Sequence, residues 1–163
     1  MFEFTESIGI DASPSEVWGL LSDLERWWLP SNPEHISLQI RSAEHKVALG
    51  TPIAFRERVA GIEGQADGTV TTFTEGVEAG WEGRAEYRYM GLRFRMREGV
   101  SWRIDADGSR SNLSAHVWAH FPPGIYGRIL EWYAKTILKV VERDRDHARR
   151  ELEYLKQQME LVN

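Results

Sequence analysis

The sequence predicts an α+β fold in which an antiparallel sheet of consecutive strands is closed by a long C-terminal helix. Residues 2–10 alternate in polarity like a strand and lead into a short amphipathic helix. About ninety residues of strand-like sequence, divided by turn residues, come next, and consecutive hairpins of this kind form an antiparallel meander. No glycine or proline then follows Gly127. A chain of 163 residues suits one domain, which we draw as residues 1–163.

The first helix has a complete set of start signals. Ser13 is placed to cap it, Pro14 suits its first position, and Glu16 completes a capping box. One apolar face follows at helical spacing, formed by Val17, Leu20, Leu21 and Leu24. We expect Asn32 and Pro33 to end a pair of short helices.

Six more strands are expected, at residues 36–40, 53–59, 65–73, 77–89, 92–104 and 112–121. The turns between them are expected at residues 50–52, 61–64, 75–76, 90–91 and 105–109, where glycine, proline and aspartate gather.

The end of the chain carries a helical apolar stripe. Its members step by three or four residues with one gap of seven: Leu130, Tyr133, Ile137, Val141, Ala148, Leu152, Leu155, Met159 and Val162. One helix of roughly 35 residues would measure about 50 Å, so its last turns would overhang the body or pack on a partner. The gap falls at Asp144 and Arg145. It marks either a polar break at the sheet edge or a buried polar contact with a ligand.

Strand alternation places two carboxylates among apolar side chains. In residues 92–104, Glu98 shares a face with Leu92, Phe94, Met96, Val100, Trp102 and Ile104. Glu57 shares a face with Ile53, Phe55 and Val59. An ionised carboxylate is costly to bury, so each either reaches solvent, pairs with an inward tyrosine or helix side chain, or faces a cavity. In a cavity, desolvation would raise a pKa, which is how general acids and bases arise.

Charge argues against nucleic acid as a partner. The formal net charge is -5, whereas phosphate binding needs clustered cations. Arginines do line the other face of residues 84–97, but Glu82 and Glu86 alternate with them, which is typical of a solvated cross-strand ladder. There is no cysteine, no signal-peptide pattern and no apolar run long enough to span a membrane. We therefore expect a cytoplasmic protein without membrane insertion.

His116 and His120 could suggest a metal site, but on a strand their side chains would lie about 13 Å apart. The alternation places both, with Trp118, on the outer face. Nucleophile elbows, glycine-rich phosphate loops, paired metal-ligand motifs and dinucleotide fingerprints are absent from the sequence. We expect no metal and no cofactor.

Two segments resemble a known family. Residues 8–28, with Ala12-Ser13-Pro14 and Val17-Trp18, and the segment Phe121-Pro122-Pro123-Gly124-Ile125-Tyr126-Gly127-Arg128 are similar to the START-like helix-grip superfamily, in particular its polyketide cyclase/dehydrase and lipid-transport branch. The resemblance covers essentially the whole chain. It implies a seven-stranded antiparallel sheet curled around the long C-terminal helix, with an apolar cavity between them. Members bind lipids, steroids, plant hormones or polyketides, and some cyclise or dehydrate polyketide chains. The family has no universal catalytic motif to transfer.

Three functions remain open. The first is binding of a small hydrophobic ligand, aromatic, polyketide-like or lipid, in a pocket of about 300–1,000 Å³. Glu57 and Glu98 would orient its polar end, and the expected walls are Phe55, Trp81, Tyr87, Phe94, Met96, Trp102, Tyr133 and Ile137.

The second function is a polyketide aromatase/cyclase or dehydratase. Glu98 or Glu57 would transfer the proton, and Tyr87 would polarise a carbonyl. The third is an accessory protein-interaction module, with the Trp118 face or the end of the last helix as the contact surface and a homodimer as one option.

Overall fold

The computed structural model describes residues 1–42, 46–59, 61–89 and 91–161. Strand β1 (Phe2–Ile10) is followed by the helices α1 (Pro14–Leu21) and α2 (Leu24–Ser31). Six strands come next: β2 (His35–Ile40), β3 (Pro52–Val59), β4 (Ile62–Thr74), β5 (Glu78–Tyr89), β6 (Leu92–Asp107) and β7 (Arg110–His120). Helices α3 (Gly124–Thr136) and α4 (Val140–Glu160) end the chain.

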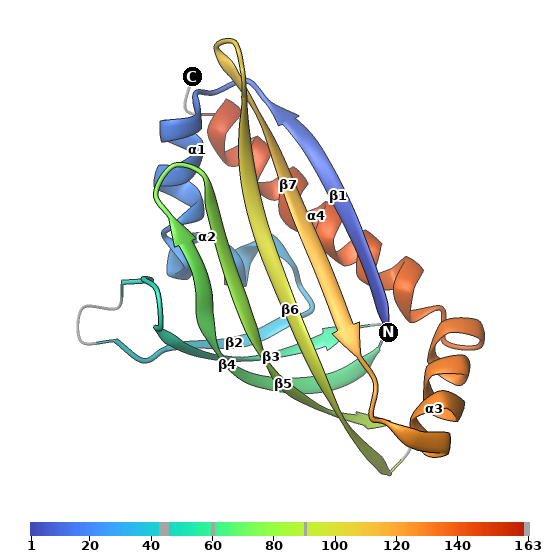
Figure 1. The fold of residues 1–163 in the computed structure, drawn as a ribbon. Coiled ribbons are helices and arrows are strands. Elements are labelled where there is room, and N and C mark those ends of the chain that lie inside the picture. Colours follow the sequence, from blue (N-terminus) through green and yellow to red (C-terminus); the bar gives the residue numbers. More distant parts are fainter. Residues whose placement is uncertain (43–45, 60, 90, 162–163) are drawn as a thin grey trace.

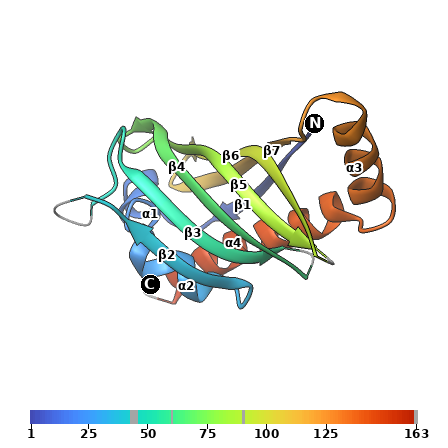
Figure 2. The ribbon, with the colours of Figure 1, turned by 90° about the horizontal axis from the view of Figure 1, so that it is seen from below.

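The strands form one antiparallel seven-stranded sheet in the order β1-β7-β6-β5-β4-β3-β2. Strands β2 to β7 are a meander, and β1 pairs with β7. The sheet is curled, and α4 runs along its concave side beside β1 (Figure 1). Figure 2 shows α1 and α2 at one end of this arrangement and α3 at the other. The predicted α+β class, strand number and curl around the last helix are confirmed.

Helix α1 begins as its sequence predicts. The Ser13 hydroxyl accepts a hydrogen bond from the Glu16 backbone N–H, and the Glu16 carboxylate accepts one from the Ser13 N–H at 2.8 Å. Helix α2 ends with Asn32 as its cap residue. Trp27 is fully buried, and its indole N–H donates to the Leu21 carbonyl at 3.0 Å. The helical pair is thereby attached to the aromatic core that fills one end of the sheet.

Two hairpins are tighter than predicted. Asp107 pairs with Arg110 and Val59 pairs with Ile62, so the strands extend into the expected loops. Gly61 and Gly108 have positive φ angles of 76° and 63°, which glycine adopts without the steric cost that a side chain adds. The hairpin predicted at residues 90–91 joins β5 to β6, although Met90 itself lies outside the described residues.

The single long C-terminal helix is a wrong prediction. The chain breaks between α3 and α4, and Lys139 there takes a left-handed conformation with φ 51°. In the sequence the apolar stripe continues from Ile137 to Val141, and neither glycine nor proline marks a break there, so the sequence predicts one helix. Because of the break, helix α4 has only 21 residues. Its last turns pack on the body instead of overhanging it, with Leu152 and Leu155 buried and the Lys156 ammonium donating to the Gly9 carbonyl at 3.0 Å. Val162 lies outside the described residues.

Candidate functional site

A cavity of about 200 Å³ lies between the concave face of the sheet, α4 and α3. Helix α3 contributes Tyr126, Leu130 and Tyr133 to its lining. The volume is below the range expected from the sequence. Nine of the predicted site residues line the cavity: Phe55, Glu57, Trp81, Tyr87, Phe94, Met96, Glu98, Trp102 and Tyr133.

Ile137 does not line the cavity, contrary to the expectation. It is the cap residue at the end of α3 and is 54% exposed. The expectation assumed one straight helix, in which Ile137 would share the stripe of Tyr133 and Val141. The break at 137–139 turns it away from the sheet instead.

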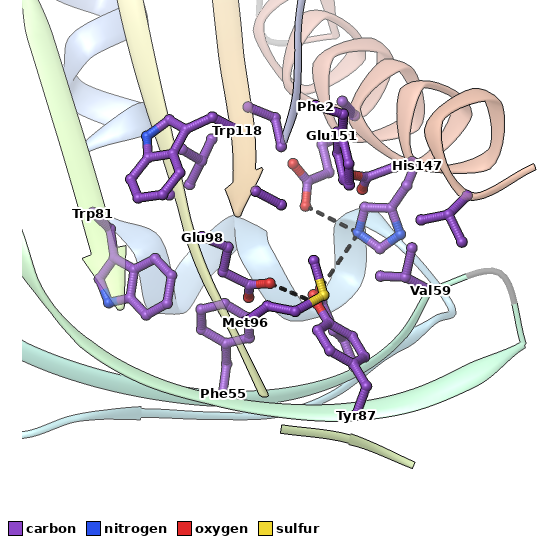
Figure 3. Close-up of a pocket in the computed structure, with 18 of the residues that line it drawn as sticks. Phe2, Phe55, Val59, Trp81, Tyr87, Met96, Glu98, Trp118, His147 and Glu151 are labelled. Atoms are coloured by element: carbon purple, nitrogen blue, oxygen red, sulfur yellow. Dashed lines mark hydrogen bonds and ion pairs between the residues drawn. The ribbon is translucent and has the colours of Figure 1, made fainter. Parts of the chain in front are cut away.

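The polar end of the cavity includes a tyrosine–carboxyl pair. Tyr87 on β5 donates a hydrogen bond from its hydroxyl to Glu98 on β6 at 2.8 Å (Figure 3). Burial raises the pKa of Glu98 to about 7. The charge of Asp144 also raises this pKa, whereas the hydrogen bond from Tyr87 lowers it. Burial and the Glu98 charge also raise the pKa of Tyr87 well above its ordinary value. Glu98 can therefore gain or lose a proton near neutral pH.

Two further carboxyls face the same end of the cavity. Burial raises the pKa of Glu57 to about 8, although the charge of His147 lowers it. Burial also raises the pKa of Asp144 on α4 to about 6, again opposed by His147. Asp144 lines the cavity, whereas the next residue, Arg145, pairs with Glu6 on β1 at 2.8 Å. The two polar residues that interrupt the apolar stripe thus have different neighbours: Asp144 lines the cavity and Arg145 contacts the edge strand β1.

Behind these carboxyls lies a buried cluster that joins β2 to α4. The Nε2 atoms of His35 and His147 are 2.9 Å apart, and the His35 Nε2 lies 3.0 Å from Glu151 Oε1. His35 is held by stacking on Trp28, with ring centroids 3.7 Å apart. Burial lowers the pKa of His147, but its hydrogen bond to Glu151 and the neighbouring carboxylates outweigh this and raise it. Burial raises the pKa of Glu151, but hydrogen bonds from both histidines outweigh this and lower it.

The sequence matches the profile of the family described as polyketide cyclase/dehydrase and lipid transport over residues 1–160. This match spans nearly the whole chain. The protein belongs to the polyketide cyclase/dehydrase and lipid-transport family. No curated protein matches the chain.

Solved structures share the fold of this polyketide cyclase/dehydrase family member at low sequence identity. A START superfamily protein from Mycobacterium smegmatis is 12% identical with a TM-score of 0.56, and 99% of each chain is covered. The Zhui aromatase/cyclase from Streptomyces sp. R1128 is 13% identical with a TM-score of 0.65, covering 98% of this chain and 93% of that one. A conserved protein from Geobacillus kaustophilus is 13% identical with a TM-score of 0.62, covering 97% and 95%.

The outer face of the sheet carries the predicted charge ladder around Glu86. This carboxylate lies 3.3, 3.6 and 4.0 Å from the nearest side-chain nitrogens of Arg95, Arg88 and Arg93, respectively. His116 and Trp118 also belong to this face by their pairing with Thr5 and Glu3. Trp118 is also among the residues that line the cavity, and its ring lies against Gly99 of β6 (Figure 3). Within the described part of this family member, no helix is long and apolar enough to cross a membrane.

Sequence reasoning missed His35, His147 and Glu151. A weak signal was present, because His147 and Glu151 are four residues apart and so share a face of a helix. His35 lies 112 residues before His147 and just before the predicted strand at residues 36–40, so nothing local connected the two.

Proposed function

We propose that this protein binds a small, mostly apolar ligand, aromatic, polyketide-like or lipid, in the cavity between the sheet and α4. The observation that supports this is a mainly apolar cavity with ionisable groups gathered at one end, Glu57, Glu98 and Asp144 with Tyr87. Such a lining favours a ligand that is apolar over most of its surface and polar at one end.

The volume limits the size of that ligand. An apolar cavity of roughly 150 Å³ accommodates benzene, so about 200 Å³ suits one or two rings or a short acyl chain. A longer polyketide would require more room. Helix α3 is the element able to provide it, because its side chains line the cavity while several of its other apolar residues, including Ile129 and Trp132, are exposed.

Titration with 2-naphthol, a two-ring compound with one hydroxyl, tests the proposal by fluorescence or calorimetry. We expect one molecule per chain. Val100→Phe should weaken binding at least about tenfold, because Val100 lines the cavity and the larger ring would occupy it. Val77→Phe is the matched control, since Val77 is exposed. Equal affinity in both variants would refute the cavity as the binding site.

A second candidate function is catalysis of an aldol cyclisation or dehydration. The Glu98 carboxyl, with a pKa of about 7 and a hydrogen bond from Tyr87, favours it. As a base, the Glu98 carboxylate would take the proton from a carbon between two carbonyls, and that carbon would then form the new bond to a third carbonyl. Once Glu98 is protonated it no longer needs the Tyr87 proton, so the Tyr87 hydroxyl would donate a hydrogen bond to the oxygen that becomes negative, and the Glu98 carboxyl would return its proton to that oxygen to give the alcohol.

Turnover of a short poly-β-ketone analogue distinguishes the two functions. In an enzyme, Glu98→Gln should lower kcat at least about a hundredfold, because proton transfer contributes roughly 10²–10⁴-fold to rate, while binding of 2-naphthol persists. Binding without turnover in both proteins would support a carrier. A third option, self-association through the Trp118 face, predicts a doubled mass in solution that reverts in Trp118→Ala.

A further inference from the structure

We propose that His35, His147 and Glu151 form a binding site for one divalent first-row transition metal ion, with zinc as the representative ion. This site goes beyond the proposed ligand binding and does not depend on it. The proposal rests on the distances between three side-chain atoms and on the groups that hold the two imidazole rings.

The three atoms are spaced like neighbouring ligands around one ion. His35 Nε2 lies 2.9 Å from His147 Nε2 and 3.0 Å from Glu151 Oε1, and His147 Nε2 lies 3.5 Å from Glu151 Oε1. Zinc binds imidazole nitrogen and carboxylate oxygen at about 2.0–2.2 Å, so two ligands of a tetrahedral site lie about 3.3 Å apart. Figure 3 shows His147 and Glu151 side by side at the cavity.

The neighbours of the two Nδ1 atoms turn both Nε2 atoms toward Glu151. His35 Nδ1 lies against the Trp28 carbonyl oxygen, which can only accept, so this nitrogen carries the proton. His147 Nδ1 lies 3.1 Å from a Glu34 carboxylate oxygen, which also favours a proton on that nitrogen. In neutral rings both Nε2 atoms then present lone pairs to each other and to a carboxylate oxygen. A cation between them, a proton or a metal ion, removes that repulsion.

The groups behind the rings match the usual surroundings of a metal-bound histidine. Such a histidine almost always donates its other ring N–H to a carboxylate, a carbonyl or water, which fixes its tautomer and orientation. His147 has the Glu34 carboxylate in this role and His35 has the Trp28 carbonyl. Stacking on Trp28 additionally holds the His35 ring in this orientation.

The ligand set indicates the class of ion. Two imidazoles with one carboxylate suit zinc or ferrous iron, whereas calcium and magnesium prefer oxygen ligands alone. Glu57 Oε2 is near enough to act as a fourth ligand, at 3.7 Å from His147 Nε2 and 4.0 Å from His35 Nε2. His147, Glu151 and Glu57 all line the cavity, so a bound ion would border it.

The test uses full-length protein purified without a histidine tag, stripped with a chelator, and equilibrated with Zn²⁺ or Co²⁺ alone. We expect one tightly bound equivalent of Zn²⁺ by elemental analysis, and Co²⁺ should show the intense visible absorption of a four-coordinate site. His147→Gln and Glu151→Gln should abolish both signals. His120→Gln and Glu153→Gln are matched controls at exposed positions and should bind as the parent does.

A substitution at a partly buried position gives a second test that does not depend on the folding of the variants at buried positions. Glu34 is only partly buried, and Glu34→Gln should weaken Zn²⁺ binding about 10- to 100-fold with an unchanged circular dichroism spectrum. Zn²⁺ should also raise the Tm of the parent but not that of His147→Gln. Absence of stoichiometric binding in the parent, or equal affinity in parent, Glu34→Gln and His147→Gln, would overturn the proposal and leave a purely proton-bridged cluster. These readouts are independent of 2-naphthol binding.

Discussion

Glu86 and Glu98 show how one side-chain type takes two roles within the same pair of strands. Glu86 on β5 faces outward, where it meets three arginines beside solvent. Glu98 on β6 faces the cavity, where its partner is the neutral hydroxyl of Tyr87. Removal from water raises the pKa of Glu98, and the hydrogen bond from Tyr87 offsets this only in part. The direction in which a strand residue points therefore decides its chemistry.

The raised pKa of Glu98 predicts a pH-dependent stability. The carboxyl pKa is about 7 in the folded chain against an ordinary 4.5, so the folded state holds the proton more tightly. The stability this contributes is complete below the unfolded pKa and is lost as pH rises through the folded pKa. Between about pH 5 and about pH 8, the parent should lose up to about 3 kcal/mol relative to Glu98→Gln. Tyr87, Asp144 and Glu57 surround this group and stay in place in both proteins.

Urea unfolding across that pH range measures the difference between the two proteins. Glu153→Gln, on the exposed side of α4, should follow the parent at every pH. A constant difference between the parent and Glu98→Gln would show that the Glu98 carboxyl does not change its affinity for protons on folding.

At the scale of an element, the break between α3 and α4 depends on one residue in an unfavourable conformation. Lys139 has a φ of 51°, which costs a side-chain-bearing residue about 1–2 kcal/mol. Lys139→Gly should raise the free energy of unfolding by up to about 1 kcal/mol, because glycine adopts this conformation freely but gains entropy in the unfolded chain. Lys139→Val should lower it. Urea unfolding measures both, and stabilisation by valine would contradict the assigned conformation.

Replacing a helical glycine by alanine should have opposite effects on stability at the start of α3 and in α1. A Cβ at Gly127 would lie 1.6 Å from the Pro122 carbonyl oxygen, a backbone atom that cannot yield cheaply. Gly127→Ala should therefore cost about 1–3 kcal/mol and shift α3. Gly19 in α1 has nothing within 4 Å of the same position, so Gly19→Ala should stabilise by about 0.5–1 kcal/mol. Thermal unfolding compares them, and equal effects would contradict the close approach at Pro122.

At the scale of the whole molecule, the curled sheet and the two C-terminal helices enclose a space that no single element defines. A ligand that binds only the folded state should stabilise it by about 2.7 kcal/mol at a hundred times Kd. For a chain of this size we expect 2-naphthol to raise the Tm by roughly 5–10 °C at that ratio. The rise should disappear in Val100→Phe, and its persistence there would place the ligand elsewhere.

Much of this architecture was predictable because its signals are local. The capping box at Ser13 and Glu16, the period-two faces of β5 and β6, and the inward position of Glu98 all depend on neighbours in the sequence. The break at Lys139 was not predictable in this way, because lysine has no preference for a left-handed conformation and the apolar stripe runs through it. The exposure of Ile137 follows from the same break.

The sequence by itself determined the class of fold, the inner face of four of the strands and nine of the residues that line the cavity. Only the tertiary structure decided the size of that cavity and the meeting of His35 with His147 across 112 residues. The physical reason is the separation along the chain of the residues that interact. Turns, caps and alternating polarity act between residues close in the chain, whereas the cavity and the histidine cluster exist only where the curl of the sheet brings β2 against α4.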